Sequence, residues 1–143
     1  MITPEAWGLP PLPEALPYAV VDAHTHLESV TERTGMPVEA NLELAARVNV
    51  ERLVDVGTDA ASSRRCVEIA ANEPRVVANV ALHPNDVARH PELVEAGLAE
   101  IERLANAGRV FGYALPGRRG GLAAPGVRAA GRHTQEATRC PGR

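Results

Sequence analysis

The chain has 143 residues, enough for one domain with a hydrophobic core and too few for two domains of ordinary size. Its formal net charge is -3, which argues against a nucleic-acid-binding surface built from bulk positive charge. All 15 basic residues are arginine, and Cys66 and Cys140 form no spacing typical of a disulfide framework or a zinc knuckle. We therefore expect a single domain in a reducing, cytoplasmic setting.

The first 17 residues are rich in proline and lack the basic start and unbroken apolar run of a signal peptide. No later stretch is long and apolar enough to cross a membrane. We expect residues 1–17 to form an extended lead-in that lies on the surface before the first strand.

A short apolar strand that ends in two histidines follows the lead-in. It reads V-V-D-A-H-T-H-L-E, from Val20 to Glu28. In a regular strand Asp22, His24 and His26 point to the same face, with the two imidazoles about 7 Å apart along the strand. Both rings can then reach one metal ion, and a flanking carboxylate can orient them or join the ligand shell. Two solvated histidines at a strand end are the plainer alternative; we favour a metal site.

The rest of the chain alternates helical and strand patterns up to residue 114. Apolar periodicity and turn residues predict a loop over 29–37, a helix over 38–50, a strand over 52–56, a helix from a cap at Thr58 or Asp59 to about Asn72, a strand over 75–82, a helix from Pro91 to Gly108 and a strand over 109–114. Cys66 falls on the buried face of its helix, so core packing is favoured over reactivity.

This order of strands and helices, with short connections, predicts parallel strands joined by right-handed crossovers. An open doubly wound sheet and the opening of a (β/α)₈ barrel both fit. No G-x-G-x-x-G segment follows the first strand, which weakens the dinucleotide-binding form of the open sheet. Histidines end the first and third strands, where a barrel carries its chemistry. We therefore predict an α/β fold over residues 18–114, a partial (β/α)₈ TIM barrel of about three and a half βα units.

Two segments, V-V-D-A-H-T-H-L-E and V-A-L-H-P-N-D, resemble the first half of the TatD family of metal-dependent hydrolases, deoxyribonucleases with an amidohydrolase-like barrel. The likeness runs from about Pro17 to about Val110. It implies that His24 and His26 are metal ligands, that Asp22 supports them, and that His83 lies beside the metal centre and contacts substrate phosphate. It also implies one or two divalent ions (Zn, Mg or Mn) and hydrolysis of phosphodiester bonds in DNA.

The later metal ligands of the family have no counterpart in this sequence. In the family, the fourth strand ends in G-E-x-G-L-D, whose glutamate bridges the metals; here it reads R-V-F-G-Y-A-L-P-G, with no carboxylate. Aspartate does not occur after Asp86, and His133, the only later histidine, has neighbours that do not resemble the end of a barrel strand. Two histidines are too few for a catalytic metal. We expect at most one weakly held ion and no complete catalytic set.

Residues 115–143 form a tail in which 20 of 29 residues are Gly, Pro, Arg or Ala, so we expect it to be disordered. It could be a basic arm that binds nucleic acid, an ordinary solvated tail, or the product of a reading frame lost near Val110. We favour the lost frame, because helical periodicity is lost and acidic residues become rare where the family glutamate is due. A half barrel also leaves an open sheet edge that invites self-association.

Three functions remain open. The first is a TatD-like hydrolase of DNA, inactive in this chain because later ligands are missing. The second is a catalytically dead fragment that binds one metal ion weakly. The third is an amidohydrolase-like enzyme that acts on a small amide or phosphoester.

Overall fold

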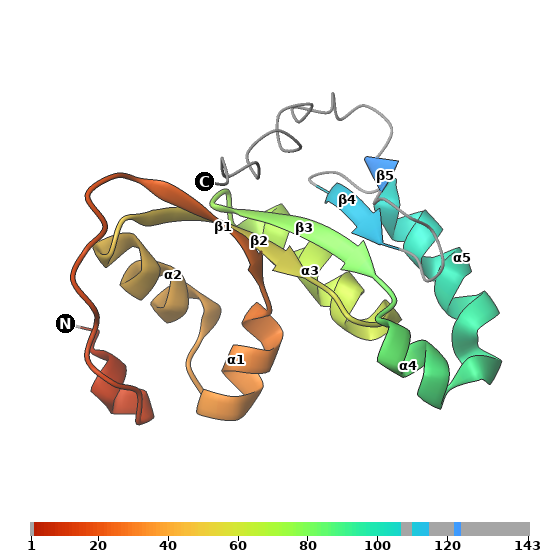
Figure 1. Cartoon of the computed structure of the whole chain (residues 1–143), viewed down its shortest axis with the longest axis horizontal. Coiled ribbons are helices and arrows are strands. Elements are labelled where there is room, and N and C mark those ends of the chain that lie inside the picture. The colour runs from red at the N-terminus through yellow and green to blue at the C-terminus, as the bar shows by residue number, and fades with distance from the viewer. Residues whose placement is uncertain (1, 107–109, 115–121, 124–143) are drawn as a thin grey trace, which may run out of the picture.

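The computed structural model describes residues 2–106, 110–114 and 122–123. Within them the chain forms one sheet flanked by helices (Figure 1). The strands are β1 (Val20–Thr25), β2 (Val50–Val56), β3 (Val76–Ala81), β4 (Val110–Ala114) and β5 (Leu122–Ala123). The helices are α1 (Leu27–Thr34), α2 (Val38–Arg47), α3 (Ala60–Asn72), α4 (Pro84–Arg89) and α5 (Val94–Ala105), with single 3-10 turns η1 (Pro4–Trp7) and η2 (Pro91–Leu93).

The strands lie in the order β1-β2-β3-β4-β5. The first four are parallel, and β5 pairs antiparallel with β4. Strands alternate with helices along the chain, as in the opening of a (β/α)₈ barrel, and this confirms the predicted fold class. All four parallel strands therefore end at one edge of the sheet, and both histidine-bearing segments lie at such an end.

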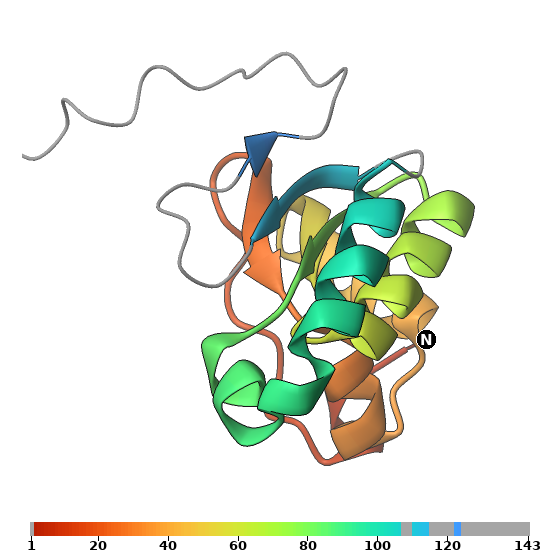
Figure 2. The same cartoon turned by 90° about the vertical axis from the view of Figure 1, so that its right-hand side faces the viewer.

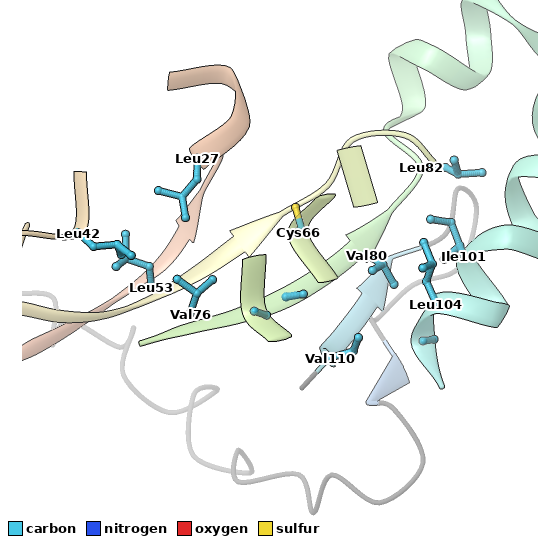
Figure 3. Packing of buried hydrophobic residues seen from close by; sticks show 13 residues of the cluster. Leu27, Leu42, Leu53, Cys66, Val76, Val80, Leu82, Ile101, Leu104 and Val110 are labelled. Atoms are coloured by element: carbon cyan, nitrogen blue, oxygen red, sulfur yellow. The ribbon is translucent and has the colours of Figure 1, made fainter. Parts of the chain in front are cut away.

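Helices α2, α3 and α5 lie on one face of this sheet (Figure 2). The main core fills the space between them and the strands (Figure 3). Its largest fully buried apolar side chains are Leu27, Leu42, Val76, Val80 and Ile101. Cys66 belongs to the same cluster and is 2% exposed, which confirms that it packs in the core.

Local sequence signals account for the start of α3. Asp59 is its N-cap and accepts a hydrogen bond from the main-chain N–H of Ser62 at 2.7 Å, while the Ser62 hydroxyl accepts from the N–H of Asp59 at 3.0 Å. This reciprocal capping box satisfies two donors at the helix start. Just before it, a Cβ on Gly57 would lie 2.2 Å from Ser63 Oγ, so only glycine lets β2 and α3 approach this closely.

Two helices occupy segments where the sequence predicted none. The expected loop over 29–37 is largely α1, and α4 follows His83 directly. In α1 the start is held by a contact from a distant strand, described below, so the local sequence gives little sign of it. In α4, His83 is the N-cap and Pro84 takes the first helical position, which suits proline because no intrahelical N–H bond is needed there.

Several predicted boundaries shift slightly. The helix predicted over 38–50 ends at Arg47, because Asn49 takes a left-handed φ of 66° and Val50 already begins β2. The strands predicted over 52–56, 75–82 and 109–114 are β2, β3 and β4, and α5 begins at Val94 after the 3-10 turn at Pro91.

The lead-in packs against α2 through a second, smaller apolar cluster. Its buried members are Met36, Ala40 and Leu44, and the side chains that cover them include Ile2, Trp7, Leu9 and Leu12. The Arg47 guanidinium donates to the carbonyl of Ile2 at 2.7 Å. Residues 1–17 therefore contain a helical turn as well as extended chain.

The predicted tail is described at one place only. Leu122 and Ala123 form β5, and the rest of residues 115–143 lies outside the described residues. His133 and Cys140 lie outside the described residues. In the part of the chain that the structure describes, no helix combines the length and apolar character needed to cross a membrane.

Candidate metal centre

His24 and His26 lie together at the end of β1. Their ring centroids are 5.1 Å apart and the ring planes are inclined by 79°. His24 lies in the strand and is exposed, whereas His26 follows it as the N-cap residue of α1 and is half-buried. The structure therefore brings the two predicted metal ligands side by side.

A β-bulge in β1 includes His24, the first histidine of the pair. Asp22 is in register with Leu53 and Thr25 with Asp55, so two residues of β1 oppose the single residue Val54. The uniform alternation of side chains assumed for Asp22, His24 and His26 does not run through this irregularity. Asp22 nevertheless contacts the site, because its Oδ1 accepts the main-chain N–H of His24 at 2.9 Å. The contact of Asp22 is therefore with the backbone of His24.

The ring of His26 is fixed by strand β2. Its Nδ1 lies 2.6 Å from the main-chain oxygen of Val56. A carbonyl oxygen can only accept, so this contact places the proton on Nδ1 and leaves the lone pair on Nε2. A metal-ligating histidine commonly donates its other ring N–H to a carbonyl or carboxylate in this way. His26 is thus oriented to ligate through Nε2.

The residue after His26 is also held by β2. The main-chain N–H of Leu27 donates to Oδ1 of Asp55 at 2.9 Å, and Asp55 is 0% exposed. Burial raises the pKa of the Asp55 carboxyl, and the hydrogen bond from Leu27 partly opposes this shift. Burial also raises the pKa of the Cys66 thiol, with the nearby Asp55 charge acting in the same direction, so Cys66 stays a thiol.

His83 follows β3 at the same edge of the sheet. Its main-chain N–H donates to the carbonyl of Thr58 at 2.6 Å, and its ring Nδ1 accepts the N–H of Asn85 at 3.2 Å. The neutral ring therefore carries its proton on Nε2, the opposite tautomer to His26. One strand separates β1 from β3, which places the two histidine-bearing ends about 10 Å apart.

The described residues supply part of a ligand shell. His24 and His26 fit two positions around an ion that accepts imidazole nitrogen, such as Zn²⁺ or Mn²⁺. Among the described residues no group of three or more His, Cys, Asp or Glu side chains could hold a metal ion. Strand β4, where the family glutamate was due, has the sequence VFGYA without a carboxylate. The pair fits a metal ion as half of its shell.

Two polar residues near the site were not singled out from the sequence. Asp55 interrupts an apolar run, L-V-D-V, and that interruption was the available signal. Asn79 on β3 is in register with Val56, and its Oδ1 is buried without a hydrogen-bond partner in the described part of the chain. A single asparagine within V-V-A-N-V-A does not by itself predict that its side-chain oxygen is buried.

A separate pocket of about 360 Å³ lies among α3, α4 and α5. Leu82, Val87 and Val94 contribute apolar surface to it, and Asp59, Arg64 and His90 contribute polar groups. Arg64 also pairs with Glu100 on α5 at 3.5 Å. Neither His24 nor His26 lines this pocket, so it is separate from the candidate metal centre.

The parallel βα units are those of the N-terminal part of a barrel protein, and the histidines at the carboxyl ends of β1 and β3 place the candidate metal centre at its mouth. The sequence model of the family described as "TatD related DNase" matches residues 21–117. The chain belongs to the TatD family. It is 38% identical over 115 residues to a Mycobacterium tuberculosis (strain ATCC 25618 / H37Rv) protein named "Uncharacterized metal-dependent hydrolase TatD". That alignment covers 76% of this chain and 42% of the relative, so the chain spans less than half of that protein's length.

Proposed function

We propose that this chain carries the N-terminal half of a divalent-metal centre for hydrolysis of phosphodiester bonds in DNA. The observation that carries the proposal is the hydrogen bond from His26 Nδ1 to Val56, which leaves Nε2 free beside the ring of His24. Family membership and the name of the mycobacterial relative support metal dependence and hydrolysis. The family description supports DNA as the substrate.

The residues have distinct roles in this proposal. His24 and His26 hold the ion, and Asp22 fixes the main chain at His24. When bound, a divalent ion supplies Lewis-acid activation of a phosphoryl oxygen and of water. His83, protonated on Nε2, donates a hydrogen bond to a phosphate oxygen across the mouth of the sheet. A phosphate bridging this distance is held between two strand ends, which orients the scissile bond.

We further propose that the chain alone binds one ion weakly and does not turn over DNA. Catalytic metal sites generally need three protein ligands and one open position. The described residues offer two nitrogens at the candidate metal centre. Weak binding without turnover follows from that shortage.

A metal titration and a nuclease assay on the full chain test both proposals. Calorimetry with Mn²⁺ and with Zn²⁺ should show one weak site that His24→Ala removes. His90→Ala is the matched control, because this exposed histidine lies in the other pocket and should leave the site intact. Binding that survives His24→Ala would refute the metal site. Metal-dependent DNA cleavage that His24→Ala abolishes would refute inactivity while supporting the substrate.

A further inference from the structure

We propose that Asp55 is a positioning residue for the metal-binding ring of His26. Its buried carboxylate holds the main-chain N–H of Leu27 and thereby keeps the His26 ring on the carbonyl of Val56. The metal-affinity part of this inference rests on the proposed function. The part that concerns ring orientation rests on the hydrogen bonds alone.

Two consecutive residues after β1 are tied to two consecutive residues of β2. His26 binds Val56 through its side chain, and Leu27 binds Asp55 through its main chain. Thr25 and Asp55 are the last register pair of the two strands, so these contacts extend the β1–β2 connection beyond the ladder. If the Leu27 tie is released, the main chain at His26 can rotate and its ring loses the Val56 carbonyl.

The first main-chain N–H of α1 is capped by Asp55 and not by the helix's own N-cap side chain. The helix begins at Leu27, and the side chain of its N-cap residue, His26, makes no capping hydrogen bond. Asp55 acts instead as a cap that comes from another strand, accepting a donor that would otherwise be unsatisfied. The position of His26 therefore depends on a residue outside its own segment.

Fold stability alone gives a poor account of Asp55. Its side chain is 0% exposed, and its Oδ2 has no hydrogen-bond partner among the described residues. A buried carboxylate that is only partly satisfied generally costs stability compared with a well-packed apolar side chain. The two arginines of the neighbouring helix α3 pair elsewhere: Arg65 with Glu28 at 2.9 Å and Arg64 with Glu100 at 3.5 Å. Besides its contact with the Cys66 thiol, the hydrogen bond to Leu27 is what this carboxylate contributes.

The test compares Asp55→Ala and Asp55→Val with Asp55→Asn in the full, metal-free chain. Valine keeps the strand apolar and well packed if the alanine variant fails to fold, and asparagine keeps an oxygen that can accept from Leu27. Ser63→Ala is the matched control: Ser63 is also 0% exposed and binds main chain, but its partner is Ala81 on β3. Long-range ¹H–¹⁵N correlation spectra report which nitrogen of His26 carries the proton.

The expected result is a fixed Nδ1–H tautomer in the wild type, Asp55→Asn and Ser63→Ala, and tautomer averaging in Asp55→Ala and Asp55→Val. Calorimetry should then show Mn²⁺ affinity weakened about 10-fold in the two averaging variants only. An unchanged His26 tautomer in the folded Ala or Val variant would overturn the inference, as would an equal change in Ser63→Ala. Absence of metal binding by the wild type would instead refute the proposed function, because the tautomer comparison needs no metal.

Discussion

His26 and Val56 are joined by a hydrogen bond of 2.6 Å from the imidazole Nδ1 to the main-chain oxygen. The two residues are 30 positions apart in the chain. The bond anchors the end of β1 to the end of β2 and at the same time selects the ring nitrogen that is free to ligate. One contact thus has a structural role and a chemical role, and a suitable substitution can separate them.

His26→Asn makes that separation. The asparagine Nδ2 occupies nearly the position of the imidazole Nδ1, so it can still donate to Val56, and asparagine is a favourable N-cap for α1. We expect the free energy of unfolding to change by less than about 0.5 kcal/mol, while the ligand nitrogen Nε2 is lost. Urea denaturation and Mn²⁺ calorimetry measure the two effects. Loss of stability without loss of metal binding would contradict the assignment of His26 as a ligand.

The buried carboxyl of Asp55 predicts a pH dependence of stability. Its pKa is raised in the folded state, so the folded chain binds more protons than the unfolded chain between the two pKa values. Stability contributed by Asp55 is therefore highest at acidic pH and declines as the pH rises through the folded-state pKa. Asp55→Asn does not titrate at this position. We expect the free energy of unfolding of the wild type, relative to Asp55→Asn, to fall as the pH rises above the ordinary pKa of an aspartate side chain, about 4.

Urea denaturation of the wild type and of Asp55→Asn at a series of pH values shows whether their difference in free energy of unfolding falls or rises with pH. Glu68→Gln is a suitable control, because it removes an exposed carboxylate from the same domain. A relative stability of the wild type that rises with pH would show that the hydrogen bond from Leu27 outweighs burial at Asp55.

Gly57→Ala should be strongly destabilising. The added Cβ would lie 2.2 Å from Ser63 Oγ and 2.6 Å from Ser63 Cα, and the second of these contacts is with backbone. Relief requires β2 and α3 to move apart, which we expect to cost about 3 kcal/mol. The double variant with Ser63→Ala removes the hydroxyl but not the backbone clash, so it should not restore stability. Thermal unfolding of Gly57→Ala and of the double variant checks this, and recovery of stability in the double variant would contradict the backbone clash.

Asp59→Ala should weaken α3 through loss of its capping box. The carboxylate accepts the N–H of Ser62 at 2.7 Å, and replacement of such a cap by alanine generally costs about 1 kcal/mol. Glu68→Ala, on the exposed face of the same helix, should change the free energy of unfolding by less than about 0.5 kcal/mol. Equal effects of the two substitutions in urea denaturation would show that the cap contributes nothing.

Much of the fold was predictable because its signals are local. The four parallel strands follow from short apolar runs bounded by turn residues, and Asp59 marks the start of α3 by its own sequence context. Where α1 begins, the stabilising partner is Asp55, 28 positions away, and the sequence between Leu27 and Thr34 gave no comparable sign. A helix whose start is stabilised by a distant residue cannot be predicted from the local sequence pattern.

The sequence by itself determined the family, the strand order along the chain and the two histidines of the candidate centre, because periodicity and motif spacing are properties of neighbouring residues. The tertiary structure alone decided the tautomer of His26, the bulge between Asp22 and Thr25, and the part played by Asp55. Each of these depends on a hydrogen bond or register between strands β1 and β2. Such pairings form between groups far apart in the chain, so they exist only once the sheet has assembled.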